Sequence, residues 1–145
     1  MTYNVWFDDH FKEERYSVIL QMMEESDADF ICMQEVTAYF MTRLLACPHI
    51  RNTYFISGNH INGYGVLIAS KYPSLFYESP FPTLQGRSFL ICEPIDGVNN
   101  KPFAVGTVHL ESGGPSGPVR IKQLKLAVEA LSKVYDHVIM GDFNF

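Results

Sequence analysis

The sequence has few cysteines, no excess of positive charge and no long apolar run. Its three cysteines, Cys32, Cys47 and Cys92, are odd in number and lack a CxxC spacing, which argues against a disulfide framework or a zinc cluster. With 11 basic against 16 acidic residues the formal net charge is -5, so no long-range positive field would gather nucleic acid unaided. No stretch approaches the roughly 20 apolar residues of a membrane span, and no basic-then-apolar signal opens the chain. We expect buried free thiols, no transmembrane segment and an intracellular location, cytoplasmic or nuclear.

The composition is that of a packed domain. Hydrophobic residues make up 47% of the 145 residues and aromatic residues 14%, which is ample for one core. There is no internal repeat, low-complexity tract or linker. We therefore expect a single domain over residues 1–145.

The apolar pattern alternates between helical and extended periods. It predicts helices at residues 12–26, at residues 37–46 ended by Pro48, and from Pro118 onward. It predicts strands at residues 2–6, 30–34, 64–70, 75–78, 88–93, 103–110 and 137–141, with a hairpin loop at 96–100. The helix stripes predicted to face the core are Val18, Ile19 and Met22, and then Ile121, Leu124, Val128 and Leu131. This order predicts a layered α/β sandwich with a mixed β-sheet flanked by helices.

Polar side chains recur where the predicted strands end. Glu35 follows one apolar run, His109 and Ser112 follow another, and Asp142 and Asn144 follow a third. Strand ends hold side chains more rigidly than loop tips do. The pattern therefore indicates a site.

The residue types suit phosphodiester hydrolysis. Mg²⁺ prefers one or two carboxylates with water and substrate phosphate, and Glu35 is the leading ligand candidate. Hydrolysis also needs an acceptor for the attacking water and donors for the charge on the phosphoryl oxygens. Asp142 suits the first role; Asn4, Asn144 and His109 suit the second.

Each candidate also has a structural interpretation. Asn4 taken alone is more typical of a buried, satisfied amide, and His109 of a strand-end histidine bonded to its neighbours. Asp142 would cap a turn. Arg87 is equally typical of an ion-pair partner. The remaining histidines, with no arranged partner, are predicted to lie at the surface: His10, His49, His60 and His137.

Six short segments appear in the order used by one enzyme family. They are Thr2-Tyr3-Asn4-Val5-Trp6-Phe7, Met33-Gln34-Glu35-Val36, Gly86-Arg87, Thr107-Val108-His109-Leu110-Glu111-Ser112, Gln123 and Gly141-Asp142-Phe143-Asn144. Along its whole length the chain resembles the endonuclease/exonuclease/phosphatase superfamily of metal-dependent phosphohydrolases. The His-Leu-Glu-Ser segment is most similar to the branch that contains 5′-tyrosyl-DNA phosphodiesterase.

The resemblance implies a role for each matching residue. Glu35 would coordinate Mg²⁺, with Mn²⁺ as a substitute, and Asn4 would help to arrange the metal and the phosphate oxygens. Asp142 would position and activate water, and Asn144 would hold the phosphate. The function implied is hydrolysis of a phosphoester by metal-assisted attack of water.

The same branch implies a substrate-binding group. His109 and Ser112 would contact the scissile phosphate of a substrate such as a DNA 5′ end. Arg87 follows a Pro-Phe-Pro segment at residues 80–82, as an Arg does in that branch.

The sequence departs from the family pattern in two places. Trp6 stands where the branch usually has an Asp after the Asn, which keeps other phosphoesters open: those of other nucleases, phospholipids, inositol phosphates or RNA ends. The family also carries a late Asp-His pair, for which nothing follows Phe145. We therefore expect that the domain is truncated at its C-terminus and that its partner is the missing C-terminal part of the same domain. In isolation it would be inactive or severely impaired.

Overall fold

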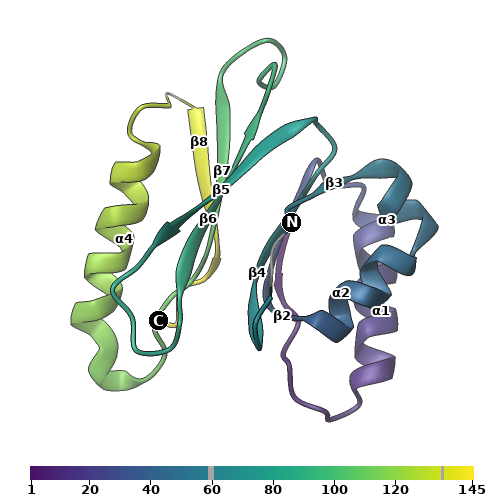
Figure 1. Ribbon diagram of the computed structural model, residues 1–145, viewed down its shortest axis with the longest axis horizontal. Helices are drawn as coiled ribbons and strands as arrows, with labels where there is room; N and C mark the ends of the chain where they lie inside the picture. The colour runs from purple at the N-terminus through teal and green to yellow at the C-terminus, as the bar shows by residue number, and fades with distance from the viewer. Residues whose placement is uncertain (59–60, 135) are drawn as a thin grey trace.

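Two four-stranded sheets lie face to face, and helices cover their outer sides (Figure 1). The computed structural model describes residues 1–58, 61–134 and 136–145. In spatial order the first sheet holds β1 (Thr2–Asn4), β2 (Phe30–Thr37), β4 (Tyr64–Ser70) and β3 (Phe55–Ile56). The second holds β5 (Ser74–Pro80), β6 (Ser88–Pro94), β7 (Phe103–His109) and β8 (Asp136–Asp142). The predicted layered α/β sandwich is confirmed, with two mixed sheets where the sequence suggested one.

The helices form the outer two layers (Figure 1). On the first sheet lie α1 (Lys12–Ser26), α2 (Ala38–Ala46) and α3 (Pro48–Thr53), and on the second lies α4 (Gly117–Leu131), preceded by the short 3₁₀ helix η1 (Gly114–Ser116). The order of layers is therefore helix, sheet, sheet, helix.

Three apolar clusters fill the spaces between these layers. One joins α1, α2 and α3 to the first sheet, and another joins α4 to the second. The middle cluster packs the sheets together through Phe30, Cys32, Ile68, Leu90, Cys92 and Val105. Cys32 and Cys92 are buried as predicted, whereas Cys47 is half-buried. Burial raises the pKa of the Cys32 thiol to about 12.

Each sheet contains one parallel pair at its edge. β1 runs parallel to β2, so that Asn4 lies opposite Gln34, and β7 runs parallel to β8, so that His109 lies opposite Asp142. Carboxyl ends of parallel strands meet at the same edge of a sheet. Both pairs therefore deliver polar residues to one end of the sandwich.

The helix boundaries show where the sequence signals were sufficient. The helix over residues 12–26 has the predicted bounds. α2 begins at Ala38 because the Thr37 hydroxyl caps it, accepting from the Phe40 N–H at 3.2 Å. Pro48 follows the end of α2 as predicted, but it is also the first residue of α3. Proline is favoured in the first turn of a helix as well as just after its last turn.

The predicted core stripes of the helices were partly wrong. In α1 the buried residues are Tyr16, Ile19 and Met23, while Val18 and Met22 are exposed. In α4 they are Gln123, Ala127 and Leu131, while Ile121 and Val128 are exposed. In each helix the predicted stripe and the residues that are in fact buried both repeat at helical spacing. Periodicity alone therefore did not distinguish them. The polar Gln123 is buried because it binds Glu111.

The histidine and membrane expectations can also be compared with the fold. His10 and His137 are exposed as predicted, although His137 has a partner, since its Nδ1 lies 2.8 Å from the Val134 carbonyl oxygen; His60 lies outside the described residues. His49 is half-buried, and its Nδ1 lies 3.8 Å from Glu24 Oε1, so its predicted lack of a partner was wrong. Among the described helices, none is both long enough and apolar enough to cross a membrane.

Candidate active site

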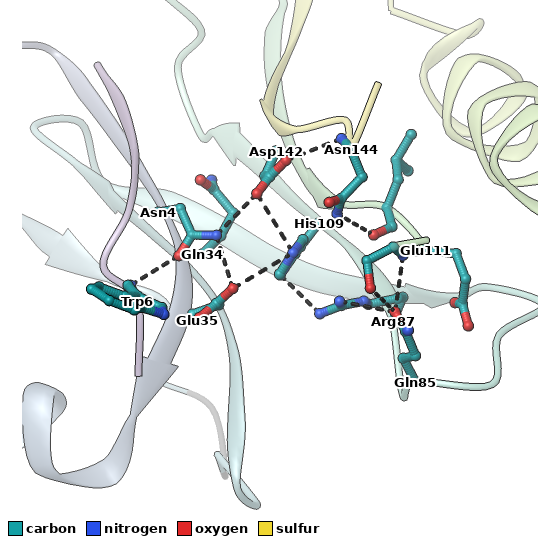
Figure 2. Close-up of polar contacts among 12 residues, drawn as sticks. Asn4, Trp6, Gln34, Glu35, Gln85, Arg87, His109, Glu111, Asp142 and Asn144 are labelled. Atoms are coloured by element: carbon teal, nitrogen blue, oxygen red, sulfur yellow. Dashed lines mark hydrogen bonds and ion pairs between the residues drawn. The ribbon is translucent and has the colours of Figure 1, made fainter. Parts of the chain in front are cut away.

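The Asn4 side chain connects the two sheets. Its Nδ2 donates to Glu35 Oε1 and to Asp142 Oδ2, each at 3.0 Å (Figure 2). Its Oδ1 accepts from the Trp6 N–H at 2.9 Å. An amide carries two hydrogens, and both are used here. In this arrangement Asn4 holds two carboxylates at fixed positions on either side of itself.

Glu35 owes its position to an irregularity in β2. The pairing of β2 with β4 shifts register between Met33 and Val36, and Glu35 there has a φ of 57°. Bulges of this kind redirect a side chain beside an active site, at a cost of roughly 1–2 kcal/mol for a left-handed non-glycine residue. Glu35 Oε2 accepts from the Phe7 N–H at 3.1 Å, and its side chain is only 13% exposed.

Asp142 depends on the glycine before it. Gly141 has a φ of 145°, and a Cβ built there would lie 2.0 Å from the Val108 carbonyl oxygen. Only glycine therefore lets β8 approach β7 this closely. Asp142 Oδ1 accepts from the Asn144 N–H at 3.0 Å, and Asn144 Nδ2 donates to the Leu110 carbonyl at 2.8 Å. These bonds fix the end of β8.

His109 directs one ring nitrogen at each side of the site. Its Nδ1 lies 2.8 Å from Arg87 Nη1, and because arginine only donates, Nδ1 is the acceptor. The neutral ring therefore carries its proton on Nε2, which lies 3.6 Å from Asp142 Oδ2 and 3.9 Å from Glu35 Oε1. Burial and the charge of Arg87 lower the pKa of His109, against the opposing effect of the two carboxylates.

A buried carboxylate organises the loop that carries Arg87. Glu111 accepts from the Thr83 hydroxyl at 2.6 Å and the Leu84 N–H at 2.9 Å. Thr83 Oγ1 in turn accepts from the Arg87 N–H at 3.0 Å, and Gln123 Oε1 accepts from the Glu111 N–H at 2.9 Å. Burial acts to raise the pKa of Glu111, but these side-chain and backbone donors outweigh it, and the pKa lies below its ordinary value.

Ser112 joins the site only through a neighbour. Its N–H and hydroxyl both donate to Gln85 Oε1 at 2.9 Å, and Gln85 Oε1 also accepts from Arg87 Nη2 at 3.1 Å. Figure 2 shows the resulting order, from Trp6 beside Asn4 and Glu35, through His109, to Arg87 and Gln85.

The structure thus brings most of the predicted residues together. Asn4, Glu35, His109 and Asp142 form the centre; Asn144 is attached to Asp142, Arg87 to His109, and Ser112 to Arg87 by way of Gln85. Sequence reasoning gave no role to Gln85 or Glu111. A buried acid within the His-Leu-Glu-Ser segment was an available signal for Glu111, whereas nothing in the sequence pointed to Gln85.

Two hollows border this centre. One, of about 20 Å³, is lined by Tyr64, Gly65, Val66, Gly86, Arg87, Ser88 and His109; that is room for about one water molecule. A wider one, of about 360 Å³, is bordered by Asn4, Asp142, Asn144 and six neighbours of theirs in β1, β2, β8 and the segment after β8. The wider hollow therefore leaves room for a ligand beside Asn4 and Asp142.

The side chains at this centre suit the magnesium ion that the sequence implies. Within the described ranges, no three His, Cys, Asp or Glu side chains form a metal-binding group. Mg²⁺ does not require one, because it commonly takes one or two carboxylates and completes its shell with water and phosphate. Glu35 supplies such a carboxylate, and Asp142 stands across Asn4 from it. The residues present therefore fit Mg²⁺ better than a metal that needs several His or Cys ligands.

Comparison with known proteins gives a consistent picture. The profile of the Endonuclease/Exonuclease/phosphatase family matches residues 1–145. No curated protein matches the chain. Among solved structures, D. rerio TDP2 complexed with single-strand DNA product is 22% identical with a TM-score of 0.86. ANGEL2, a 2',3'-cyclic phosphatase, is 19% identical with a TM-score of 0.79, and the human Nocturnin catalytic domain with bound sulfate is 17% identical with a TM-score of 0.72.

These structures are longer than the chain. It is covered to 99% by TDP2, 99% by ANGEL2 and 92% by Nocturnin, and covers 59%, 51% and 57% of them respectively. At these identities the similarity shows the fold.

Proposed function

The chain belongs to the Endonuclease/Exonuclease/phosphatase family, and from that premise we propose that it is a Mg²⁺-dependent phosphodiesterase. One observation carries the proposal: the Asn4 amide holds Glu35 and Asp142 together beside His109 Nε2. Phosphoester hydrolysis needs a metal ligand, an acceptor for the water proton and a donor for the phosphoryl oxygens. This cluster contains one of each.

Glu35 is the proposed metal ligand. Mg²⁺ bound there, or Mn²⁺ in its place, would neutralise charge on the phosphate and polarise it. The Phe7 N–H at one carboxylate oxygen and the Asn4 amide at the other fix the direction of the Glu35 side chain. A preoriented ligand does not have to be ordered when the substrate arrives.

Asp142 is the proposed acceptor for the attacking water. Each of its oxygens already accepts one N–H, from Asn144 and from Asn4, and each keeps a further lone pair. The carboxylate can therefore orient the water and take its proton without turning. The backbone N–H of Asn144 fixes the direction of Asp142. One side-chain N–H of Asn144 is bound to the Leu110 carbonyl oxygen, and the other could donate to a phosphate oxygen.

His109 is the proposed donor to the phosphoryl oxygens. The Arg87 guanidinium keeps Nδ1 as an acceptor and thereby keeps the proton on Nε2, on the side of the carboxylates. The same arginine places positive charge behind the ring. A neutral imidazole in this tautomer can donate a hydrogen bond at pH 7 without being charged.

The proposed substrate is a nucleic-acid phosphodiester, with a DNA 5′ end as the first candidate. Its supports are the His-Leu-Glu-Ser segment at residues 109–112 and the similarity to a TDP2 structure that contains single-strand DNA product.

The test is hydrolysis by the full chain in Mg²⁺. Three substrates are compared: bis(4-nitrophenyl) phosphate, a 5′-tyrosyl single-stranded oligonucleotide and 2',3'-cyclic AMP. Asp142→Asn should lower the rate about 10²–10⁴-fold, the usual contribution of a positioned base. Asp136→Asn is the matched control, since Asp136 is exposed at the opposite end of β8. Equal rates for Asp142→Asn and wild type would reject the site, whereas turnover of only the simple diester would reject the nucleic-acid assignment.

A further inference from the structure

The loop between β1 and α1 places two exposed aromatic rings at the margin of the site. Trp6 is 47% exposed and Phe7 is 45% exposed. The Trp6 N–H is bound to Asn4 Oδ1 and the Phe7 N–H to Glu35 Oε2. Both rings are therefore attached, through their own backbone, to the residues that hold the proposed metal and water. Figure 2 shows Trp6 beside Asn4 and Glu35, on the side of the cluster opposite Arg87.

Each ring is supported by a second planar group. The Arg15 guanidinium lies 4.7 Å from the centre of the Trp6 ring. Phe7 is stacked on Tyr64, with centroids 4.7 Å apart and planes 28° apart. A planar group packed against a ring limits its motion and leaves the exposed remainder for contact with something else.

The backbone of the loop is fixed with unusual completeness for an exposed segment. Arg15 donates to the carbonyl oxygens of Val5 at 2.8 Å, Trp6 at 2.9 Å and His10 at 2.8 Å, and also to that of Asp8. Trp6 itself has a φ of 55°. A bulky residue in the left-handed region is strained, and such strain concentrates at functional sites. The fixed backbone of this loop therefore holds the large apolar ring of Trp6 at the surface.

We propose that Trp6 and Phe7 form a stacking platform for a nucleobase adjacent to the scissile phosphate, and that the substrate is therefore a single-stranded nucleic-acid end. The inference rests on the proposed function, because the phosphate is taken to lie at Glu35 and His109. In a single strand the bases are free to leave one another and stack on aromatic side chains, and every base has a suitable face. Acyl chains and inositol rings lack that flat π surface.

The charge of the chain is compatible with this partner. A net charge of -5 opposes long-range capture of nucleic acid, but stacking acts at contact. Around the platform, Arg15 lies under Trp6 and Arg87 lies 5.5 Å from the Tyr64 ring, while Asp9 is paired with Lys12 at 2.5 Å. With Arg15 and Arg87 as the cations that meet the strand, one or two phosphates would be neutralised. The logarithm of affinity should then fall with the logarithm of salt concentration with a slope of about -1.

Trp6 makes the test direct, because it is the only tryptophan in the chain. Its fluorescence is followed while a short single-stranded DNA, or the same strand with abasic sites at its 5′ end, is added to the full chain in Ca²⁺, which takes oxygen ligands as Mg²⁺ does and would neutralise the carboxylates beside the phosphate. Anisotropy of a dye on the 3′ end measures binding independently. The intact strand should quench Trp6, and the abasic strand should bind about 5- to 150-fold more weakly, the range of base–aromatic stacking.

Variants locate the effect. Trp6→Ala should weaken binding of the intact strand by a factor in the same range as the loss of the base. This variant should also bind the intact and abasic strands with nearly equal affinity. Trp6→Phe keeps an aromatic ring and should retain most of the wild-type affinity. Phe55→Ala is the matched control: Phe55 is 48% exposed and pairs with Ser70, at the end of β4 away from Tyr64. It should bind like wild type. The comparison of intact and abasic strands uses the wild-type protein, so it does not depend on any variant folding.

Three results would overturn the proposal: no binding of the intact strand, saturation without a change in Trp6 fluorescence, or equal affinity for intact and abasic strands. The proposed function is judged separately, by hydrolysis of bis(4-nitrophenyl) phosphate in Mg²⁺. Turnover with a silent Trp6 would reject the platform alone, and a quenched Trp6 without turnover would reject the enzyme alone.

Discussion

Replacing Glu111 by glutamine should destabilise the fold through the loop that carries Arg87. The side chain is 1% exposed and receives the Thr83 hydroxyl on Oε2 and the Leu84 N–H on Oε1. Thr83 Oγ1 cannot reverse its role, because it already accepts from the N–H groups of Gln85 and Arg87. A glutamine at this position must therefore place its NH₂ group against either the Thr83 hydroxyl or the Leu84 N–H, both of which are donors.

The expected cost follows from that clash. A hydrogen bond to a charged acceptor contributes about 1.5–3 kcal/mol, and a buried donor left unsatisfied adds a similar desolvation penalty. With partial relaxation, the loss should be about 2–4 kcal/mol. At about 4 °C per kcal/mol for a chain of this size, the melting temperature should fall by roughly 8–16 °C.

Thermal unfolding followed by circular dichroism at pH 7 measures the effect, with Glu129→Gln on the exposed face of α4 as the control. The pKa of Glu111 is lowered in the folded state, so its contribution is present above the ordinary value of 4.5 and is lost as pH falls through the folded pKa. The difference between wild type and variant should therefore shrink below about pH 4.5. A melting temperature within 2 °C or so of the control at pH 7 would refute the reasoning.

Three further predictions concern other parts of the site and core. Gly141→Ala should lower stability by about 2 kcal/mol or more and displace Asp142, because its Cβ would meet the Val108 carbonyl; urea denaturation checks this, and an unchanged midpoint would contradict it. The pKa of His109 is lowered in the folded state, so stability should fall as pH drops from about 6.5 through the folded pKa; melting temperature against pH should show this fall in wild type and lose it in His109→Gln. Under native conditions a thiol reagent such as DTNB should modify Cys47 first, since Cys32 and Cys92 are buried with raised pKa values; early modification of all three would contradict the packing of the sheets.

The sequence was sufficient for those elements whose signals are local. The strand at residues 64–70 and the helix at residues 12–26 have the predicted bounds. Glu35 and Asp142 were identified because each comes at the end of an apolar run in the sequence, although the structure places both inside their strands and leaves β8 exposed or half-buried. These features depend on neighbours within a few positions, where propensity and periodicity operate.

The local sequence pattern could not predict the contacts between segments that are distant in the chain. Nothing local shows that the Asn4 amide would reach Asp142 in the other sheet, or that Gln85 would connect Ser112 to Arg87. The buried face of α4 was misjudged because the polar Gln123 occupies a core position, where its amide meets Glu111. Tertiary hydrogen bonds decided these positions in place of hydrophobicity.

The most direct test of the account is a Mg²⁺ titration of the full chain by calorimetry, paired with the rate of diester hydrolysis at each metal concentration. The account predicts one saturable site whose occupancy tracks the rate, with both lost in Glu35→Gln and both kept in Glu129→Gln. Mg²⁺ binding or hydrolysis that survives in Glu35→Gln at the wild-type level would contradict it.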